Sequence, residues 1–209
     1  SQAARRNPDA ALFPVVQGGM MPGLRAEQAQ AMAALNFDGY AIGGLSVGEP
    51  KELMLAMVEA TTPELPENKP RYLMGVGTPG DLHHAVSCGV DLFDCVLPAR
   101  NGRHGLLFTR QGLLRIKNAA YREDPLPPDP ECSCPVCSRL SRAFLHHLVR
   151  AGEITGAVYG TLHNLRYFLD FMADLGKAIE SCRLADAAPP RASRPADGNR
   201  SETTDAPTR

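Results

Sequence analysis

Two hydrophobic patterns alternate along residues 11–97. Short runs of β-branched and aromatic residues predict strands over 13–16, 40–42, 72–76 and 90–97. The stretches between them, 25–35, 50–60 and 79–88, carry apolar residues at helical spacing, and the last two begin with proline. Strand followed by helix, repeated along the chain, predicts an α/β fold with parallel strands and right-handed crossovers.

Glycine follows each of the first three predicted strands, at 18–19, 43–44 and 75 and 77. Glycine at the carboxyl ends of parallel strands lets a ligand approach the backbone, and in a (β/α)8 barrel the active site lies on that face. Four units make half a barrel, whose other half must come from elsewhere because the sheet edges are otherwise open. A flavodoxin-like open sheet is the alternative fold, and simple turn formation is the alternative role of each glycine.

Composition narrows the class of protein. The 209 residues carry a formal net charge of −1 from 22 basic and 23 acidic side chains, which excludes a globally cationic nucleic-acid binder. No apolar run approaches a membrane span and no signal peptide opens the chain, so we expect a cytoplasmic protein without membrane association. The chain does not begin with methionine, and we interpret it as a fragment.

Three cysteines lie within six residues and predict a metal site. Cys132, Cys134 and Cys137 follow the spacing C-x-C-x2-C, and three thiolates in one loop favour a structural zinc ion with four ligands. The spacing leaves three candidates for the fourth ligand, and it leaves open that the thiols are free: the candidates are His146, His147 and His163. The separate cysteines, Cys88, Cys95 and Cys182, are expected to be small buried residues.

A carboxylate near the end of the fourth predicted strand is the candidate reactive group. Asp94 lies in an apolar strand, where a charge is costly unless it is paired or used. Simple hydrogen bonding to loop amides is the alternative. The following residues, 95–122, contain six arginines and lysines and no acidic residue, which suits a polyanionic partner. A solvated loop is the alternative.

These motifs together resemble the carboxyl-terminal half of bacterial tRNA-guanine transglycosylase, also called queuine tRNA-ribosyltransferase. The resemblance covers residues 11–180. It is carried by the cysteine loop and by the segments Val15-Val16-Gln17-Gly18-Gly19, Ala41-Ile42-Gly43-Gly44-Leu45-Ser46-Val47-Gly48-Glu49, Tyr72-Leu73-Met74-Gly75-Val76-Gly77, Phe93-Asp94-Cys95-Val96-Leu97-Pro98-Ala99-Arg100 and His163-Asn164-Leu165.

The resemblance implies a (β/α)8 TIM barrel, here strands 5–8, with an inserted zinc-binding subdomain. The implied parts are the barrel half over 1–125 and the zinc subdomain with the closing helices over 126–183. A disordered tail over 184–209 is predicted from composition instead, because 186–209 contain four prolines and no Val, Ile, Leu, Met, Phe or Tyr. The implied reaction exchanges the wobble guanine of certain tRNAs for a 7-deazaguanine base. Asp94 would be the nucleophile that bonds to ribose, as carboxylates do in retaining glycosidases.

The resemblance also implies a role for individual residues. Gln17, Gly44, Leu45 and Met74 would bind the base, and Val47 and Glu49 would favour the aminomethyl precursor of queuine. Arg100 and Arg103 would hold the anticodon loop. The zinc ligands would be Cys132, Cys134, Cys137 and His163, which selects His163 among the three candidate histidines.

The family's other catalytic aspartate and first four strands lie in an amino-terminal half that this sequence does not contain. We therefore expect the isolated chain to have little or no exchange activity. Full-length bacterial relatives are homodimers, which is the expected state of the complete enzyme. Two other interpretations remain: a non-catalytic, zinc-containing tRNA-binding module or partner subunit, and an unrelated zinc-ribbon protein on an open sheet.

Overall fold

The structure, a computed structural model, describes residue 7 and residues 9–187, which divide into two compact units. One unit comprises the described residues up to Arg100 together with 168–187, and the other comprises 101–167. Each unit is described by itself below. The division falls at residue 100, whereas the sequence placed the start of the zinc subdomain at 126.

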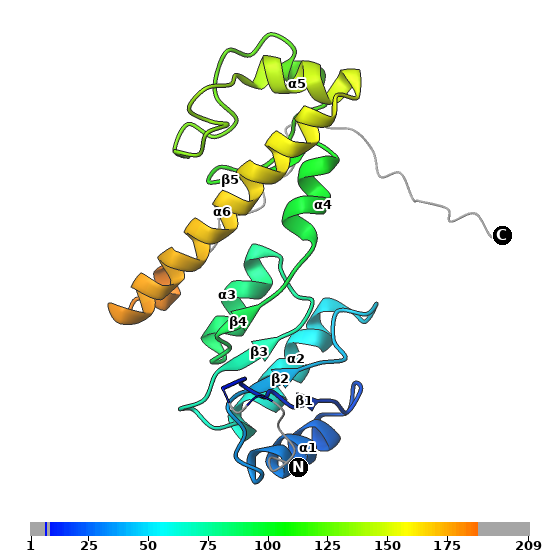
Figure 1. Cartoon of the computed structure of the whole chain (residues 1–209), viewed down its shortest axis with the longest axis vertical. Helices are drawn as coiled ribbons and strands as arrows, with labels where there is room; N and C mark the ends of the chain where they lie inside the picture. Colours follow the sequence, from blue (N-terminus) through cyan, green and yellow to red (C-terminus); the bar gives the residue numbers. More distant parts are fainter. Residues whose placement is uncertain (1–6, 8, 188–209) are drawn as a thin grey trace, which may run out of the picture. The chain divides into compact units, whose positions relative to one another are not determined.

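The first unit is built on a parallel sheet with the strand order β1-β2-β3-β4 (Figure 1). The strands are short: β1 is Val15–Val16, β2 is Tyr40–Ile42, β3 is Arg71–Leu73 and β4 is Leu92–Phe93. Their register aligns Val16 with Ile42, Ile42 with Leu73, and Leu73 with Phe93. Because sequential strands are neighbours, the chain steps across the sheet in one direction.

Three helices connect these strands. They are α1 (Pro22–Ala33), α2 (Lys51–Thr61) and α3 (Pro79–Ser87). Proline opens α1 and α3, and the Thr78 side chain caps α3 by accepting a hydrogen bond from the Asp81 amide. A core of buried apolar side chains lies between helices and sheet, and includes Val16, Ile42, Met57, Val58 and Leu73.

Helix α1 contacts α2, and α2 contacts α3, as expected when right-handed crossovers advance in one direction and place the helices on one face. This order differs from the flavodoxin-like order 2-1-3-4-5, in which the chain reverses direction. The first unit is therefore an α/β structure with a parallel sheet, and its strands follow one another across the sheet in sequence order, as they do in a barrel. Within the described residues, β1 and β4 each have one unpaired edge.

The prediction of one long strand over 90–97 was wrong at its end. Strand β4 stops at Phe93, and Leu97 begins helix α4 (Leu97–Arg103). A run of apolar residues has no intrinsic preference that separates strand from helix over so short a length. Asp94 therefore lies just beyond the strand.

The second unit begins with an antiparallel hairpin that the sequence did not predict. Its strands are β5 (Leu106–Thr109) and β6 (Gly112–Arg115), joined by a two-residue turn. Helix α5 (Arg142–Ala151) covers it with Leu145, and Leu107 and Ile116 complete a small core. Ser141 caps the start of α5, and Gly152 ends it with a φ of 76°.

Helix α6 (Ile154–Glu180) is the longest element, and its residues are shared between the two units. In the second unit, α4 and α6 approach closely at two glycines. A Cβ on Gly102 would lie 2.5 Å from the Thr161 nitrogen, and one on Gly160 would lie 2.5 Å from the Gly102 oxygen. Only glycine allows these two backbones to meet in this way.

The chain end differs in part from the expected tail over 184–209. Residues Leu184–Ala187 form the 3-10 helix η4, and the His83 ring bonds the Leu184 carbonyl at 3.1 Å. The rest of that tail lies outside the described residues. Cys182, expected to be buried, is exposed just after α6, with a φ of 55°. Among the helices that the structure describes, none has the length and apolarity needed to cross a membrane.

Candidate functional site: a strand-end row and a Cys3His centre

The first candidate site is a row of residues at the carboxyl ends of the four parallel strands. Each strand ends in the register row Val16, Ile42, Leu73 and Phe93. The next residues along the chain are Gln17, Gly43, Met74 and Asp94. Because parallel strands share one direction, these four positions lie along one edge of the sheet. We call them the strand-end row.

The Asp94 carboxylate is held by two donors. Its Oδ1 accepts a hydrogen bond from the Tyr72 hydroxyl at 2.7 Å and from the Gly75 amide at 2.8 Å. Both hydrogen bonds lower the pKa of Asp94, and the bond from the Gly75 amide has the larger effect. The hydrogen bond to Asp94 in turn raises the pKa of the Tyr72 hydroxyl. Its Oδ2 makes no hydrogen bond with the described residues. The result is an exposed, ionised carboxylate with one oxygen fixed and the other available for reaction.

Gln17 lies against the glycines that follow β2. A Cβ on Gly44 would come within 2.4 Å of the Gln17 Oε1, and one on Gly43 would lie 3.0 Å from its Nε2. Gly44 also has a φ of 66°, which glycine adopts without strain. The missing side chains therefore leave the Gln17 side-chain amide beside the glycine backbone, which is exposed at Gly44, an arrangement suited to hydrogen bonding a flat ligand.

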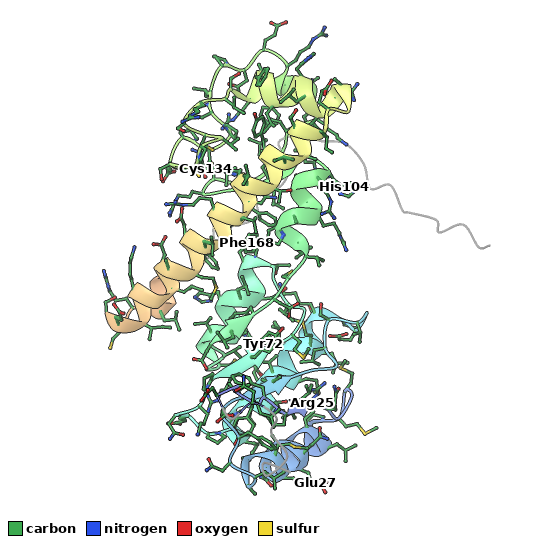
Figure 2. All side chains as sticks on the ribbon, in the orientation of Figure 1. Arg25, Glu27, Tyr72, His104, Cys134 and Phe168 are labelled. Atoms are coloured by element: carbon green, nitrogen blue, oxygen red, sulfur yellow. The ribbon has the colours of Figure 1, made fainter. Side chains whose placement is uncertain are left out.

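A buried arginine that the sequence did not single out connects the first two strand-end loops. Arg25 of α1 is 0% exposed. Its Nε donates to the Gly19 carbonyl at 2.6 Å, and its terminal nitrogens donate to the Gly43 and Gly44 carbonyls at 3.1–3.3 Å. Burial lowers its pKa, and the nearby Glu49 opposes this. Figure 2 labels Arg25 and, two positions along α1, Glu27.

The loop after β2 is pinned by its own carboxylate. Glu49 accepts hydrogen bonds from the Ser46 and Val47 amides, the latter at 2.9 Å. Burial raises the pKa of Glu49, but these backbone bonds outweigh it and the pKa is lowered. The Val47 side chain is 78% exposed, whereas Leu45 is buried in the core.

The other predicted contacts are placed as follows. Met74 is 37% exposed, and its amide donates to the Ile42 carbonyl, which fixes it beside β2. Arg100 and Arg103 lie three residues apart on α4, and both are exposed. Residues that are three apart share a helix face.

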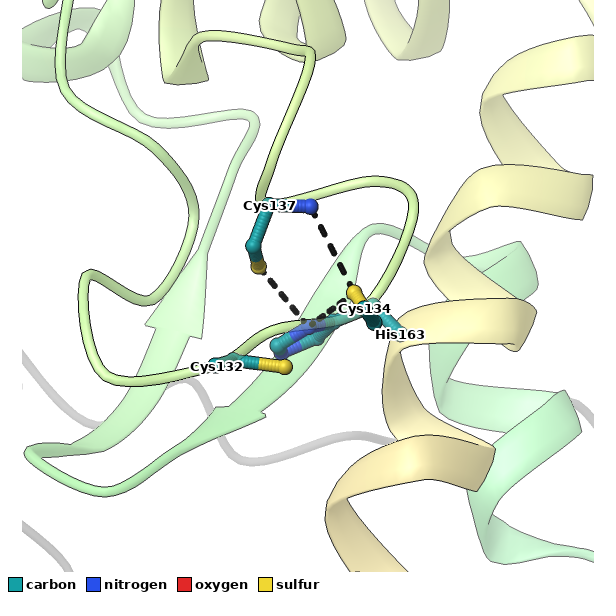
Figure 3. A group of neighbouring side chains, drawn as sticks. All are labelled: Cys132, Cys134, Cys137 and His163. Carbon is teal, nitrogen blue, oxygen red and sulfur yellow. Dashed lines mark hydrogen bonds between the residues drawn. The ribbon is translucent and has the colours of Figure 1, made fainter.

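The second candidate site is a compact cluster of three sulfur atoms and one nitrogen. The Sγ atoms of Cys132, Cys134 and Cys137 and a ring nitrogen of His163 all lie within 4.8 Å of one another (Figure 3). The His163 Nδ1 is 3.3 Å from the Cys137 sulfur and 3.7 Å from the Cys134 sulfur. The edges of a tetrahedron around zinc, with metal–sulfur bonds of about 2.3 Å, measure roughly 3.5–3.8 Å.

Its electrostatics favour a cation. Burial raises the pKa of the Cys132 and Cys137 thiols, and the Cys134 side chain raises both further. Converging thiolates are thus stable only beside a positive charge, as a divalent ion supplies. The four residues therefore fit a structural metal site with no open position.

His163 has its free nitrogen toward the sulfurs. Its Nε2 donates to the Phe108 carbonyl at 2.8 Å, and a carbonyl can only accept, so Nε2 carries the proton and Nδ1 holds the lone pair. Burial lowers the pKa of His163, which keeps the ring neutral. The His163 residue is 0% exposed and lies within α6.

Two buried polar residues support this centre. The Asn164 side chain accepts from the Phe108 amide and donates to the Leu106 carbonyl, both at 3.0 Å. Asp129, which is 1% exposed, accepts from the Arg110 and Glu131 amides at 2.9 and 3.0 Å. Asn164 thus joins α6 to the hairpin, and Asp129 joins the hairpin turn to the cysteine loop.

Sequence reasoning missed the roles of four residues: Arg25, Tyr72, Asp129 and Asn164. Tyr72 carried the clearest signal, since a strand tyrosine near a strand end needs a partner for its hydroxyl. Arg25 carried almost none, because arginine on a helix usually extends into solvent.

Comparison with known proteins identifies the family of this chain. The family model described as queuine tRNA-ribosyltransferase matches residues 1–194. The queuine tRNA-ribosyltransferase of Thiobacillus denitrificans is 54% identical over 186 residues, covering 89% of this chain and 51% of that protein. That of Nitrosomonas europaea is 57% identical over 175 residues, covering 84% and 47%.

A third relative, from Ralstonia nicotianae, is 56% identical over 183 residues and is covered to 48% of its length. The chain thus spans about half the length of the curated relatives that it matches. On the family match and these identities, the chain belongs to the queuine tRNA-ribosyltransferase family.

Proposed function

We propose that this chain supplies the nucleophilic half of a tRNA-guanine transglycosylase active site. The reaction exchanges the wobble guanine of queuosine-family tRNAs for 7-aminomethyl-7-deazaguanine, as part of queuosine biosynthesis. The observation that carries the proposal is the Asp94 carboxylate, ionised and fixed through one oxygen at the strand-end row. Membership of the queuine tRNA-ribosyltransferase family supports tRNA as the substrate that this carboxylate attacks.

The chemistry takes two displacements at one carbon. Asp94 attacks the ribose anomeric carbon, the bond to guanine N9 breaks, and its electron pair leaves with guanine, which takes up a proton. The incoming base then attacks the same carbon, loses a proton and releases the carboxylate. A low pKa suits the nucleophile in the first step and the leaving group in the second.

The strand-end row has the length for such a substrate. Three strand spacings measure about 14 Å, which spans a sugar-linked purine and a hydrogen bond at its far edge. We assign base binding to Gln17, Gly44, Leu45, Met74, Val47 and Glu49. Arg100 and Arg103 would bind the anticodon loop, where unpaired bases can be turned out.

Two structural assignments accompany this function. We infer that the parallel sheet is half of a (β/α)8 barrel, because its sequential strand order and its open edges at β1 and β4 suit closure by four more strands. We infer that the Cys3His centre holds one Zn²⁺, which would supply a structural crosslink to the hairpin and α6.

The complete enzyme is proposed to be a cytoplasmic homodimer. The resemblance places the family's other catalytic aspartate, the proposed acid that protonates guanine, in an amino-terminal half. The isolated 209-residue chain is therefore expected to show little or no exchange. A non-catalytic tRNA-binding module or partner subunit is the second candidate. It would use the exposed arginines of α4 but would have no need of the Asp94 carboxylate and its two donors.

A chimaera tests the function directly. Residues 11–180 of this chain replace the matching half of the Thiobacillus denitrificans relative, and incorporation of radiolabelled guanine into tRNA is measured. We expect exchange that Asp94→Asn lowers by a factor on the order of 10⁴ or more. A denaturing gel should show a protein–tRNA adduct that depends on Asp94. Folded chimaera that binds tRNA without exchange or adduct would favour the binding module.

A further inference from the structure

The second unit contains a cationic pocket that the proposed reaction does not use. It has a volume of about 600 Å³. Its lining comes from the segment after β6 and from α5, and comprises Lys117, Ala119, Arg122, His146, His147 and Arg150. All of these residues belong to one compact unit. We call it the α5 pocket.

A buried histidine holds the two walls of the α5 pocket together. His146 is 9% exposed, and its Nδ1 donates to the Ile116 carbonyl at 2.7 Å. Ile116 is fully buried, so the next residue, Lys117, leaves the core at a fixed point. Arg150 lies one helical turn beyond His146 and therefore on the same face of α5. The backbone positions of Lys117 and Arg150 are thus held relative to each other by the hydrogen bond between His146 and Ile116.

The wall formed by the segment after β6 is anchored at a second point. The 3-10 helix η3 (Ala119–Tyr121) precedes Arg122, and the Arg142 guanidinium lies 5.7 Å from the centre of the Tyr121 ring. Arg142 is itself paired with Asp124 at 3.1 Å. Asp124, two residues from Arg122, is thus already paired with Arg142.

The charge of the α5 pocket is uncompensated. No acidic side chain lines it, and Lys117, Arg122 and Arg150 form no ion pair with the described acidic residues. Lys117, Arg122, His147 and Arg150 are all exposed. Several cations around one cavity repel each other, which favours an anionic ligand that can accept several N–H donors at once.

We propose that the α5 pocket binds a backbone phosphate of the RNA substrate, as a contact separate from Arg100 and Arg103. Phosphate oxygens accept from lysine and arginine without regard to sequence, so this contact would position the RNA and would not read its bases. The proposal rests on the proposed function for the identity of the RNA. The pocket residues themselves take no part in the displacement at Asp94.

The test measures tRNA binding by the full 209-residue chain as a function of salt. The variant K117Q/R122Q is compared with R139Q/K177Q, which removes the same charge from exposed residues outside the pocket. We expect K117Q/R122Q to weaken binding of a transcribed tRNA on the order of tenfold at 0.1 M salt and to reduce the salt slope by about one for each cation removed. Arg150→Gln should give a smaller loss in the same direction.

Equal affinity and equal salt slope for the two double variants would overturn the proposal, as would a wild-type chain that binds no tRNA. Titration with pyrophosphate, followed by the NMR signals of the His146 and His147 rings, separates a second source of phosphate. Saturation by pyrophosphate while K117Q/R122Q binds tRNA normally would assign the pocket to a small phosphate compound instead. Failure of the chimaera to exchange guanine, with the pocket effect intact, would reject the proposed reaction but not the pocket.

Discussion

The two candidate sites of this chain differ in how completely the chain itself encloses them. The Cys3His centre is closed: its histidine is fully buried, its nearest residues are tied to the hairpin, and all four ligands come from one compact unit. The strand-end row is open, with an exposed Asp94 and a parallel sheet whose outer edges are unpaired among the described residues. The described chain therefore encloses the proposed metal ligands by itself, whereas it leaves the proposed reactive carboxylate exposed.

The largest effect should follow disruption of the Cys3His centre. Structural zinc contributes on the order of 10 kcal/mol of binding free energy to small domains, so Cys137→Ser or chelation should unfold the second unit. Hydrogen exchange of the Leu107 and Phe108 amides would measure this, with Cys182→Ser as the matched control because Cys182 is exposed and outside the cluster. Hairpin amides that stay protected after chelation would show that the centre is not structural.

Arg25→Ala should produce the next largest loss. It leaves the Gly19, Gly43 and Gly44 carbonyls without their shared donor, and the free energy of unfolding should fall by about 3 kcal/mol. Arg25→Lys should recover part of this, since one ammonium cannot reach all three carbonyls. Glu27→Ala on the exposed face of α1 is the control, with an expected change within about 0.5 kcal/mol. Equal losses for Arg25→Ala and Glu27→Ala would show that the hydrogen bonds of Arg25 to the three carbonyls do not stabilise the first unit.

Tyr72→Phe should change protonation at Asp94 more than it changes stability. The Tyr72 hydroxyl helps to lower the pKa of Asp94, so its removal should raise that pKa. The ionised form of Asp94 is lost as the pH falls through its pKa, and the variant should therefore lose it at a higher pH than the wild type. A carbon-13 NMR titration of the Asp94 carboxyl measures the shift directly, and an unchanged or lower pKa would contradict the hydrogen bond.

The smallest effect is expected at Glu49. Glu49→Gln removes the charge that holds the Ser46 and Val47 amides, while the side-chain length is kept. Severalfold faster hydrogen exchange at these two amides is expected, with no change in the melting of either unit. The neighbouring Glu52→Gln, exposed on α2, is the control. Exchange rates that do not differ between the two variants would show that the loop is held by other contacts.

Much of the strand-end row could be predicted from sequence. Short β-branched runs ending in glycine locate the strand ends, and strict alternation of strand and helix makes the strands parallel. The sequence therefore predicts that positions 17, 43 and 94 lie along the edge of the sheet formed by the carboxyl ends of its strands. The cysteine spacing likewise predicts the metal loop, since three thiolates so close along a chain converge without much entropy loss.

What sequence could not supply are contacts between distant segments. The apolar run after Phe93 is compatible with either a strand or a helix, and its sequence does not predict that α4 begins at Leu97. The role of Arg25 depends on three carbonyls that two separate loops bring to it. Spacing alone also left three histidines as the fourth ligand, because the choice depends on where a residue within α6 meets the cysteine loop.

The shared register of the strand-end row restricts how this half of the protein can change length. Inserting or deleting one residue within a strand would move its row member by about 3.3 Å and turn its side chain to the opposite face. Loops that enter the strands from the other edge carry no such constraint. Insertions should therefore be better tolerated before Val15 and Tyr40 than within the strands themselves.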